Sequence, residues 1–203
     1  MLTLASIFVL LLAYLIGSIP AGVLVGKAFG FDPRAVGSGN IGMTNVGRAG
    51  GKGAAALTFA GDVLKGLIPI LIGNAMNVSQ GGLALIALAT LVGAIYSIFL
   101  GFSGGRGVSA ALGIWLGLAP ASVAPILLVI FLVVLAVSRI VSAASITAAL
   151  ALPIVVALSS YEQYFLMSLV MTALVVWRHR ENIGRLAAGN EPALGRGEKE
   201  TAA

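Results

Sequence analysis

Long apolar segments separated by short polar patches make up most of the chain. Near-continuous apolar runs cover about residues 2–25, 54–75, 81–100, 108–137, 143–158 and 162–177. A membrane-crossing helix needs about 20 consecutive apolar residues, and most of these runs approach that length. They lack the alternation of apolar and polar positions that a transmembrane β-barrel requires. The pattern therefore predicts an all-α integral membrane protein.

The run over residues 108–137 is 30 residues long, which exceeds one ordinary membrane span. Ala119 and Pro120 fall within it, and the residue before a proline disfavours helical backbone. We therefore expect two short helices that turn there, and seven transmembrane helices in total. The segment from Gly17 to Pro20 should kink the end of the first helix. We interpret residues 1–203 as a single membrane-embedded domain with a flexible tail from about residue 190.

Composition agrees with a membrane protein and narrows the chemistry. Hydrophobic residues make up 59% of the chain and charged residues only 9%, and the mean hydropathy is +1.07. The absence of cysteine and the single histidine exclude thiolate and multi-histidine metal sites. Because the sequence also has no carboxylate cluster, we expect neither a metal ion nor a cofactor. Membrane topology explains the net charge of +5 better than nucleic-acid binding does.

The distribution of charge tests the count of seven helices. With seven, the polar patches at 26–53, 101–107, 138–142 and 178–203 all lie on one side of the membrane. That side receives eleven of the twelve Lys and Arg residues, whereas the opposite connections carry only Glu162. Positive residues mark the cytoplasmic side, so the N-terminus is expected outside and the C-terminus in the cytoplasm. Five helices would place Arg139 outside and require a 35-residue span.

The longest polar interruption in the first half of the chain runs from Val36 to Arg48. It combines four glycines with one Ser, one Thr, two Asn and one Arg, and it contains no acid. Glycine lets backbone N–H groups turn toward an anion, and hydroxyl, amide and guanidinium groups add further donors. The stretch indicates a phosphate cradle, although a flexible loop between helices is an alternative. Its candidate ligands are Gly37, Ser38, Gly39, Asn40, Thr44, Asn45 and Arg48.

Three further patches have the same character. Gly101 to Gly107 contains Arg106 among glycines, Ser142 follows Arg139, and the tail opens with His179 between two arginines. Because all four patches are expected on one face, we interpret them as one site for a phosphorylated ligand. Juxtamembrane cations that only contact lipid headgroups are the alternative, but they would not need flanking glycines.

The sequence leaves the roles of Asp62, Lys65 and His179 undecided. Asp62 and Lys65 are three residues apart on one helix, so they share a face and can pair, either for function or only to orient the helix. His179 should have a lowered pKa because its neighbours are positive, or it is an interfacial residue at a helix end. A nucleophilic Ser38 or Ser142 activated by His179 is conceivable, but no acid is placed to orient the histidine.

These motifs resemble, in order and over almost the whole chain, those of the bacterial acyl-phosphate:glycerol-3-phosphate acyltransferases. The matching segments are Gly37–Asn40 with Thr44, Asn45 and Arg48, then Asp62 and Lys65, Gly101–Gly107, Arg139–Ser142 and His179–Ile183. The resemblance implies a seven-helix enzyme of the bacterial inner membrane with a site that faces the cytoplasm. It would transfer an acyl group from acyl phosphate to the sn-1 hydroxyl of glycerol 3-phosphate, the first step of phospholipid synthesis.

The resemblance also implies residue roles. Ser38, Arg48, Arg106, His179 and Asn182 would act in catalysis. The partners would be acyl phosphate, glycerol 3-phosphate and membrane lipid, without nucleic acid or an obligate protein partner. Direct attack by the acceptor hydroxyl would suffice, with its proton taken by His179 or by a substrate phosphate oxygen. Substrate would be bound by Gly37, Gly39, Asn40, Thr44, Asn45, Asp62, Lys65, Gly104, Gly105, Gly107 and Ser142.

The chain departs from the family pattern around the second glycine-rich loop. Lysine is usual at Arg106 and Ser103, and His and Pro are usual at Ala94 and Ser97. A basic residue is also usual where Pro192 and Ala193 stand. Arg106 keeps the positive charge, but it cannot donate or accept a proton in catalysis. A transporter, or a weakly active binder of a phosphorylated anion, is the alternative function. A transporter would need a polar path to the far side, where the connections are nearly uncharged.

Overall fold

The computed structural model of the chain describes residues 4–119 and 121–194. Every regular element in these ranges is helical, which confirms the predicted all-α class. Three single-turn 3₁₀ segments, Pro33–Ala35, Ile98–Leu100 and Glu162–Tyr164, join some of the helices. The α-helices are α1 (Leu4–Ser18), α2 (Ala21–Ala28), α3 (Met43–Ala75), α4 (Gln80–Ile95), α5 (Val108–Leu118), α6 (Val123–Ser138), α7 (Val141–Ala157), α8 (Phe165–Arg178) and α9 (Arg180–Ala187).

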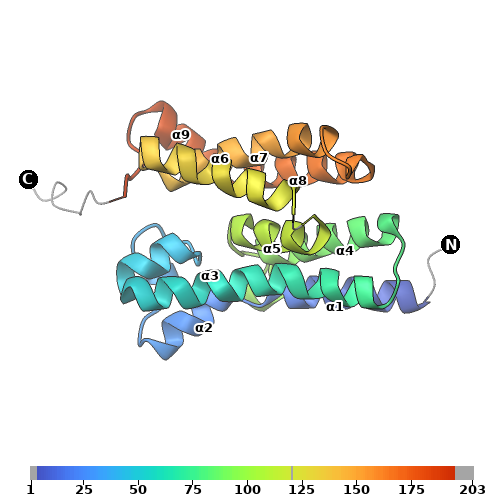
Figure 1. Cartoon of the computed structure of the whole chain (residues 1–203). Helices are drawn as coiled ribbons and strands as arrows, with labels where there is room; N and C mark the ends of the chain where they lie inside the picture. Colours follow the sequence, from blue (N-terminus) through green and yellow to red (C-terminus); the bar gives the residue numbers. More distant parts are fainter. Residues whose placement is uncertain (1–3, 120, 195–203) are drawn as a thin grey trace, which may run out of the picture.

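The long helices run roughly along one direction in two layers, with α1, α3, α4 and α5 in one and α6, α7 and α8 in the other (Figure 1). Small residues allow close pairing within the first layer. A methyl group on Gly66 of α3 would collide with the carbonyl of Ala110 in α5, and one on Gly17 of α1 would collide with that of Thr90 in α4. This is the small-residue packing that membrane helices use in place of a hydrophobic driving force.

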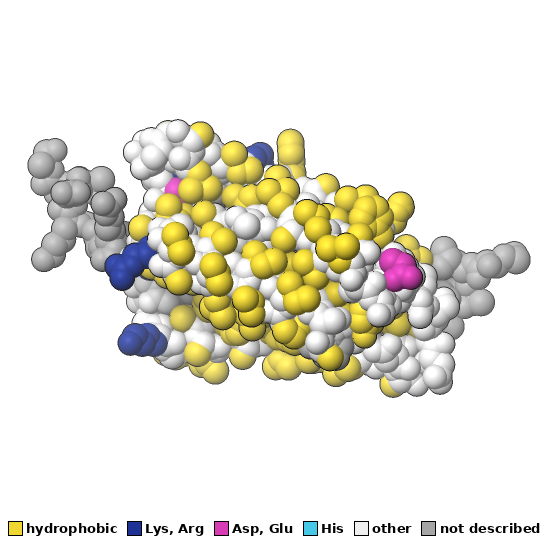
Figure 2. Space-filling view, turned by 45° about the horizontal axis from the view of Figure 1, so that its top comes forward, with side chains coloured by type: hydrophobic (Ala, Val, Ile, Leu, Met, Phe, Trp, Pro, Cys, Tyr) yellow, Lys and Arg dark blue, Asp and Glu magenta, His cyan; other side chains and the backbone are white. Residues whose placement is uncertain are grey.

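The two layers meet in a common apolar core. Its members come from α1 and from α3 to α8, and they include Leu91, Trp115, Leu152 and Met171, each at most 5% exposed. The outer surface is also apolar along the length of the molecule, while Lys and Arg side chains gather at one end (Figure 2). That end carries α2, the start of α3 and α9 (Figure 1).

The expected kink of the first helix is a complete break. Helix α1 ends at Ser18 and α2 begins at Ala21, because Pro20 lacks the N–H group that would continue the ladder. The expected turn near Ala119 is present as well, between α5 and α6. Leu118, Ala119 and Val123 at its two ends are at most 8% exposed, whereas Ala121 in the turn is exposed.

The expected loop over residues 26–53 is partly wrong. Helix α2 continues to Ala28, and α3 begins at Met43 rather than near Ala54. Gly51 has φ 77° and ψ −175°, so it separates a first helical segment up to Gly50 from the long helix that follows. Thr44, Asn45 and Arg48 therefore lie on a helix, and only the earlier part of the polar stretch is a loop.

Within residues 4–119 and 121–194, three helical segments are long and apolar enough to cross a membrane: Ile7–Ala28, Met43–Ala75 and Gln80–Leu100. The apolar helices α5, α6 and α7 are shorter. Helix α5 has 11 residues, which corresponds to a rise of about 16 Å. A hydrocarbon core is about 30 Å thick, so α5 does not cross it unaided. All seven predicted apolar segments are helical, but the number of complete crossings stays a prediction.

Candidate functional site

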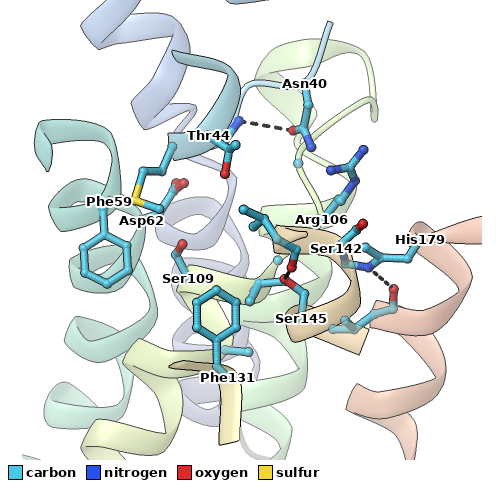
Figure 3. A pocket seen from close by; sticks show the side chains of 18 of the residues that line it. Asn40, Thr44, Phe59, Asp62, Arg106, Ser109, Phe131, Ser142, Ser145 and His179 are labelled. Atoms are coloured by element: carbon cyan, nitrogen blue, oxygen red, sulfur yellow. Dashed lines mark hydrogen bonds between the residues drawn. The ribbon is translucent and has the colours of Figure 1, made fainter. Parts of the chain in front are cut away.

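A cavity of about 1380 Å³ lies between the two layers. At one end it is lined by polar and charged side chains from the loop at 36–42, from α3, from the start of α5 and from α7 to α9. Figure 3 shows Asn40, Thr44, Arg106, Ser142 and His179 around this end. Farther along, the lining is apolar, with residues of α5, α6, α7 and α8. The cavity therefore has a polar compartment that is continuous with an apolar one.

The cavity brings together nearly all of the residues that the sequence singled out. Each of them lines it except Gly39 and Gly104. Ser103, where the family pattern has lysine, is exposed and does not line it either. The four polar patches thus converge, as expected from their placement on one face, although Arg139 of the third patch stays outside.

Asn45 organises the first loop. Its side-chain oxygen accepts a hydrogen bond from the N–H of Ser38 at 2.9 Å, and its amide nitrogen donates to the carbonyls of Pro33 and Val36 at 2.8 and 3.0 Å. Asn45 is 3% exposed. Its amide is fully engaged within the protein, so it positions Ser38 at the cavity wall.

Asn40 performs a similar task at the start of α3. Its side-chain oxygen accepts a hydrogen bond from the N–H of Gly42 at 3.1 Å (Figure 3). Because α3 begins one residue later, Asn40 fixes the entry of this helix into the site. The groups of this region that remain available to a ligand include the Ser38 hydroxyl, the Thr44 hydroxyl and the Arg48 guanidinium. Among the described residues, Arg48 has no ion-pair partner.

The second glycine-rich loop does not present its N–H groups as expected. Gly104 and Gly105 donate them to the carbonyls of Ile95 and Ala94, at 3.0 and 3.1 Å. Their own carbonyls accept hydrogen bonds from Arg178, at 3.0 Å for Gly104 and 3.3 Å for Gly105. The loop is therefore tied to α4 on one side and to α8 on the other, and these two N–H groups do not point at a ligand.

What this loop offers to the cavity is Arg106 and the start of α5. Gly107 has φ 78° and ends the loop, and α5 begins at Val108. The first N–H groups of a helix have no partner within it and favour an anion. Burial lowers the pKa of the Arg106 guanidinium, with the positive Arg185 and Arg178 acting in the same direction and Glu191 opposing it. A negatively charged ligand would therefore stabilise this buried guanidinium.

Glu191 joins three elements at the polar end. Its carboxylate accepts hydrogen bonds from the Ser142 hydroxyl at 2.7 Å, from the Asn182 amide, and from Nε of Arg185 at 2.7 Å. Burial alone would raise the pKa of Glu191, but these hydrogen bonds hold it below its ordinary value. Glu191 therefore keeps α7, α9 and the tail together as a negative centre beside Arg106.

The first residues of the tail expected to be flexible from about residue 190 contact the rest of the protein, and the flexibility of the tail stays a prediction. Besides the bonds of Glu191, the N–H of Leu194 donates to the carbonyl of Arg139 at 2.7 Å. The remainder of the predicted tail, 195–203, lies outside the described residues. The tail closes over the site because the carboxylate finds three donors there, and the sequence alone does not place those donors together.

His179 is 1% exposed and points one ring nitrogen away from the cavity (Figure 3). Its Nδ1 lies 2.8 Å from the carbonyl of Val175, so in the neutral ring Nδ1 carries the proton and Nε2 is an acceptor. Burial lowers the pKa of His179 to about 4, with the bond to Val175 opposing and the charge of Arg106 reinforcing the shift. The predicted lowering is confirmed, but desolvation is the main cause rather than neighbouring charge.

Asp62 and Lys65 form an ion pair of 2.7 Å in the wall of the cavity. Lys65 also donates to the carbonyl of Ile19 at 3.1 Å, in the break between α1 and α2. That carbonyl also accepts a hydrogen bond from the N–H of Ala21 at 3.1 Å. Lys65 therefore has a structural role at the break, while the carboxylate of Asp62 also reaches the cavity.

Sequence reasoning missed several residues of the site. Ser109 and Ser145 add hydroxyl groups to the wall, Arg185 and Glu191 form a 2.7 Å ion pair there, and Arg178 holds the second loop. For Glu191 there was one signal, since it is an acid in a region otherwise rich in cations. Within the described part of the chain, no three His, Asp or Glu side chains gather as a metal site would require.

Comparisons with known proteins agree on one family. The family model described as "Glycerol-3-phosphate acyltransferase" matches residues 7–189. The chain is 47% identical over 188 residues to the glycerol-3-phosphate acyltransferase of Geotalea daltonii, covering 92% of this chain and 96% of that protein. It is 51% identical over 189 residues to the protein of the same name from Geobacter metallireducens, covering 93% and 97%.

Two crystal structures of PlsY (YgiH), an integral membrane glycerol 3-phosphate acyltransferase, have a similar fold. The glycerol 3-phosphate form superposes with a TM-score of 0.89 at 40% identity, covering 94% of this chain and 96% of that one. The lysophosphatidic acid form gives a TM-score of 0.88 at 39% identity with the same coverage. The likeness thus extends over nearly the full length of both chains.

Proposed function

The chain belongs to the glycerol-3-phosphate acyltransferase family and is an integral membrane protein, and from this premise we propose its reaction. It transfers a fatty acyl group from acyl phosphate to the sn-1 hydroxyl of glycerol 3-phosphate, giving 1-acyl-glycerol 3-phosphate and phosphate. The observation that carries the proposal is that the cationic end of the 1380 Å³ cavity is continuous with an apolar compartment. The first suits two phosphate groups, and the second suits an acyl chain.

The two phosphates have separate sets of ligands in this proposal. Arg48, Ser38 and Thr44 hold the acceptor, because they surround one side of the polar compartment. Arg106 and the start of α5 hold the phosphate of the donor, on the side where Asn182 and Ser142 lie. The guanidinium of Arg106 stabilises negative charge as phosphate leaves, and positioning of the two substrates supplies much of the remaining acceleration.

The chemistry needs no acyl-enzyme intermediate. The sn-1 oxygen attacks the acyl carbonyl carbon, the bond from that carbon to the phosphate oxygen breaks, and phosphate departs with the electron pair. Nε2 of His179 accepts a hydrogen bond from the hydroxyl and orients it. With a pKa of about 4, the imidazole holds a proton only weakly. A phosphate has a second pKa near 6, so the proton ends on phosphate oxygen.

The same proposal fixes the arrangement in the bacterial inner membrane. The cationic end faces the cytoplasm, because positive residues mark that side, and the N-terminus then lies outside. The seven apolar segments keep their predicted order. Helices α5 and α6 form a hairpin, and the connection between them lies on the side opposite the cationic end.

The direct test is release of inorganic phosphate by purified protein mixed with acyl phosphate and glycerol 3-phosphate. We expect release to require both substrates and to yield one acylated glycerol 3-phosphate per phosphate. Glycerol without its phosphate is the matched control acceptor, and it should react poorly because Arg48 has no anion to bind. Absence of release would contradict the proposal and favour a binder or a transporter. Uptake of glycerol 3-phosphate into liposomes would then identify the transporter.

The role of His179 has its own test. If His179 orients the hydroxyl, His179→Gln keeps an acceptor and mainly raises KM, whereas loss of a general base would lower kcat.

The lowered pKa of His179 also predicts how the stability of the protein depends on pH. Because the folded state favours the neutral ring, the stabilisation is complete above about pH 6.5 and is lost as pH falls toward 4. The melting temperature of the wild type should therefore fall more steeply over this interval than that of His179→Gln.

A further inference from the structure

The apolar compartment of the cavity has two unlike parts. We call the first the open arm: it is lined by Phe59, Leu128 and Leu132, which are 36%, 40% and 50% exposed. The second is the closed arm, lined by residues that are each at most 5% exposed. These are Trp115, Ala124, Leu152, Met171 and Val175. A chain in the open arm would contact lipid and meet no end wall, whereas a chain in the closed arm would.

The closed arm ends at one level on four helices. Its deepest lining residues are Trp115 on α5, Ala124 on α6, Leu152 on α7 and Met171 on α8. The residues behind them are buried and do not line the cavity: Leu118, Val123, Val156 and Met167. Along α7, Ser142 at the polar end and Leu152 are ten residues apart, which corresponds to about 15 Å of helix rise. The arm is therefore a slot of defined depth with a packed floor.

Trp115 is the largest and best-held part of this floor. It is 1% exposed, and its ring meets that of the buried Tyr164 edge to face, with centroids 6.3 Å apart and an interplanar angle of 83°. Tyr164 follows the α7–α8 connection, so residues from distant parts of the chain fix the indole. The indole N–H has no hydrogen-bond partner among the described residues. Its volume, rather than a polar contact, is what it presents to the slot.

We propose that the closed arm holds the acyl chain of the donor and that Trp115 sets the longest chain that reacts well. The identity of the ligand rests on the proposed function, but the depth of the slot does not. A chain that stops short of the floor leaves apolar surface unburied, and each missing methylene lowers kcat/KM about fourfold. A chain that is too long collides with the indole, and its reacting carbonyl is displaced from the polar end.

The kinetic test compares saturated acyl phosphates of increasing length at fixed glycerol 3-phosphate. Trp115→Ala deepens the slot, so the chain length with the highest kcat/KM should rise by at least one two-carbon step, which changes the ratio of neighbouring lengths about 15-fold. Ala124→Leu fills the floor and should shift the optimum to shorter chains. If both variants keep the wild-type optimum, the proposal is overturned.

Two matched controls accompany these variants. Trp115→Phe keeps most of the ring volume and removes the N–H, so it should retain the wild-type optimum; a shift as large as that of Trp115→Ala would contradict a role based on volume. Ala136→Leu makes the same change as Ala124→Leu on the exposed face of α6, outside the cavity lining. It should leave the length profile unchanged.

A binding test separates this inference from the reaction itself. The chain has two tryptophans, and Trp177→Phe leaves Trp115 as the only one. Lysophosphatidic acid brominated at different positions along its acyl chain is then titrated in detergent. Bromine near the terminal methyl should quench Trp115 most, and bromine near the carbonyl least. The Trp115→Phe variant, in which only the exposed Trp177 reports, should show no such order.

The two tests fail in different ways. If no acyl phosphate releases phosphate but terminal bromine still quenches Trp115 selectively, the proposed donor is wrong and the slot stands. If phosphate release is normal while quenching is independent of bromine position, the acyl chain lies elsewhere and the role of Trp115 is overturned.

Discussion

Two glycine-rich loops border the polar end of the cavity, and the protein holds them by different means. The loop at 36–42 is held by the side chain of Asn45, which bonds three backbone groups of the segment before it. The loop at 101–107 is held from both sides by other helices, through the backbone of α4 and through Arg178 of α8. The first loop is thus locally supported, whereas the second depends on the packing of the two layers.

The difference explains what the glycines are for. A methyl group on Gly37 would collide with the side-chain oxygen of Asn45, and one on Gly104 would lie 2.5 Å from the carbonyl of Ala94. In both loops glycine lets another protein group approach the backbone. The groups left for a ligand are then side chains and the start of α5, so the first loop positions Ser38 and the second positions Arg106.

The largest effect should come from removing the arginine of the second loop. Arg106→Ala leaves the donor phosphate without its buried cation, and kcat/KM should fall about 10²- to 10³-fold. Arg106→Lys restores the charge and should recover most of the activity. Phosphate release measures both variants, and a melting temperature in detergent checks that they fold. Normal turnover by Arg106→Ala would show that the second loop does not hold the departing phosphate.

The next largest effect should distinguish residues that hold the second loop in place from residues that bind the ligand. Gly104→Ala places a methyl group against α4 and should destabilise the protein by about 1–3 kcal/mol, as overpacking does. Gly105→Ala is the matched control, because its methyl group meets nothing closer than 3.7 Å. Thermal unfolding and phosphate release should both distinguish the pair. Equal behaviour of the two variants would mean that the contact with α4 does not hold this loop.

The corresponding change in the first loop should be of similar size but more local. Asn45→Ala removes three hydrogen bonds and leaves partly buried backbone groups unpaired, at a cost of about 1–3 kcal/mol. Because the support is local, hydrogen exchange should increase at residues 33–38 and stay unchanged at 101–107. Asn190→Ala, at an exposed asparagine outside both loops, is the control. Increased exchange in both loops would indicate that they are coupled.

The smallest effect is expected at the exposed edge of the first loop. Hydrogen bonds from Arg34 lower the pKa of Asp32 from 3.8 to about 2. The stabilisation from this ionised carboxylate is complete above about pH 4 and is lost only as pH falls toward 2. An exposed pair is also screened by solvent, so Asp32→Asn should not change the melting temperature measurably at pH 7. A clear decrease would make this pair part of the loop's support.

The sequence predicted the helices, a kink near Pro20, the turn near Ala119 and the convergence of the polar patches, because apolar runs, prolines and charge each have a direct structural meaning. It did not predict which hydrogen-bond donors of the site already have partners within the protein. Whether the N–H of Gly105 is free depends on the carbonyl of Ala94, which only the fold brings there. The hydrogen bonds of Glu191 could not be predicted for the same reason, since its partner Ser142 lies 49 residues away in the sequence.

The bond from Lys65 to Ile19 bears on how the protein enters the membrane. Synthesis delivers the N-terminal part of the chain first, so the broken end of α1 is in place before α3 emerges. When α3 inserts, the ammonium group of Lys65 can pair with Asp62 of its own helix and then donate to the carbonyl of Ile19 at the break, which also accepts from the N–H of Ala21. A charge that is costly in lipid thereby becomes the point at which a later helix recognises an earlier one.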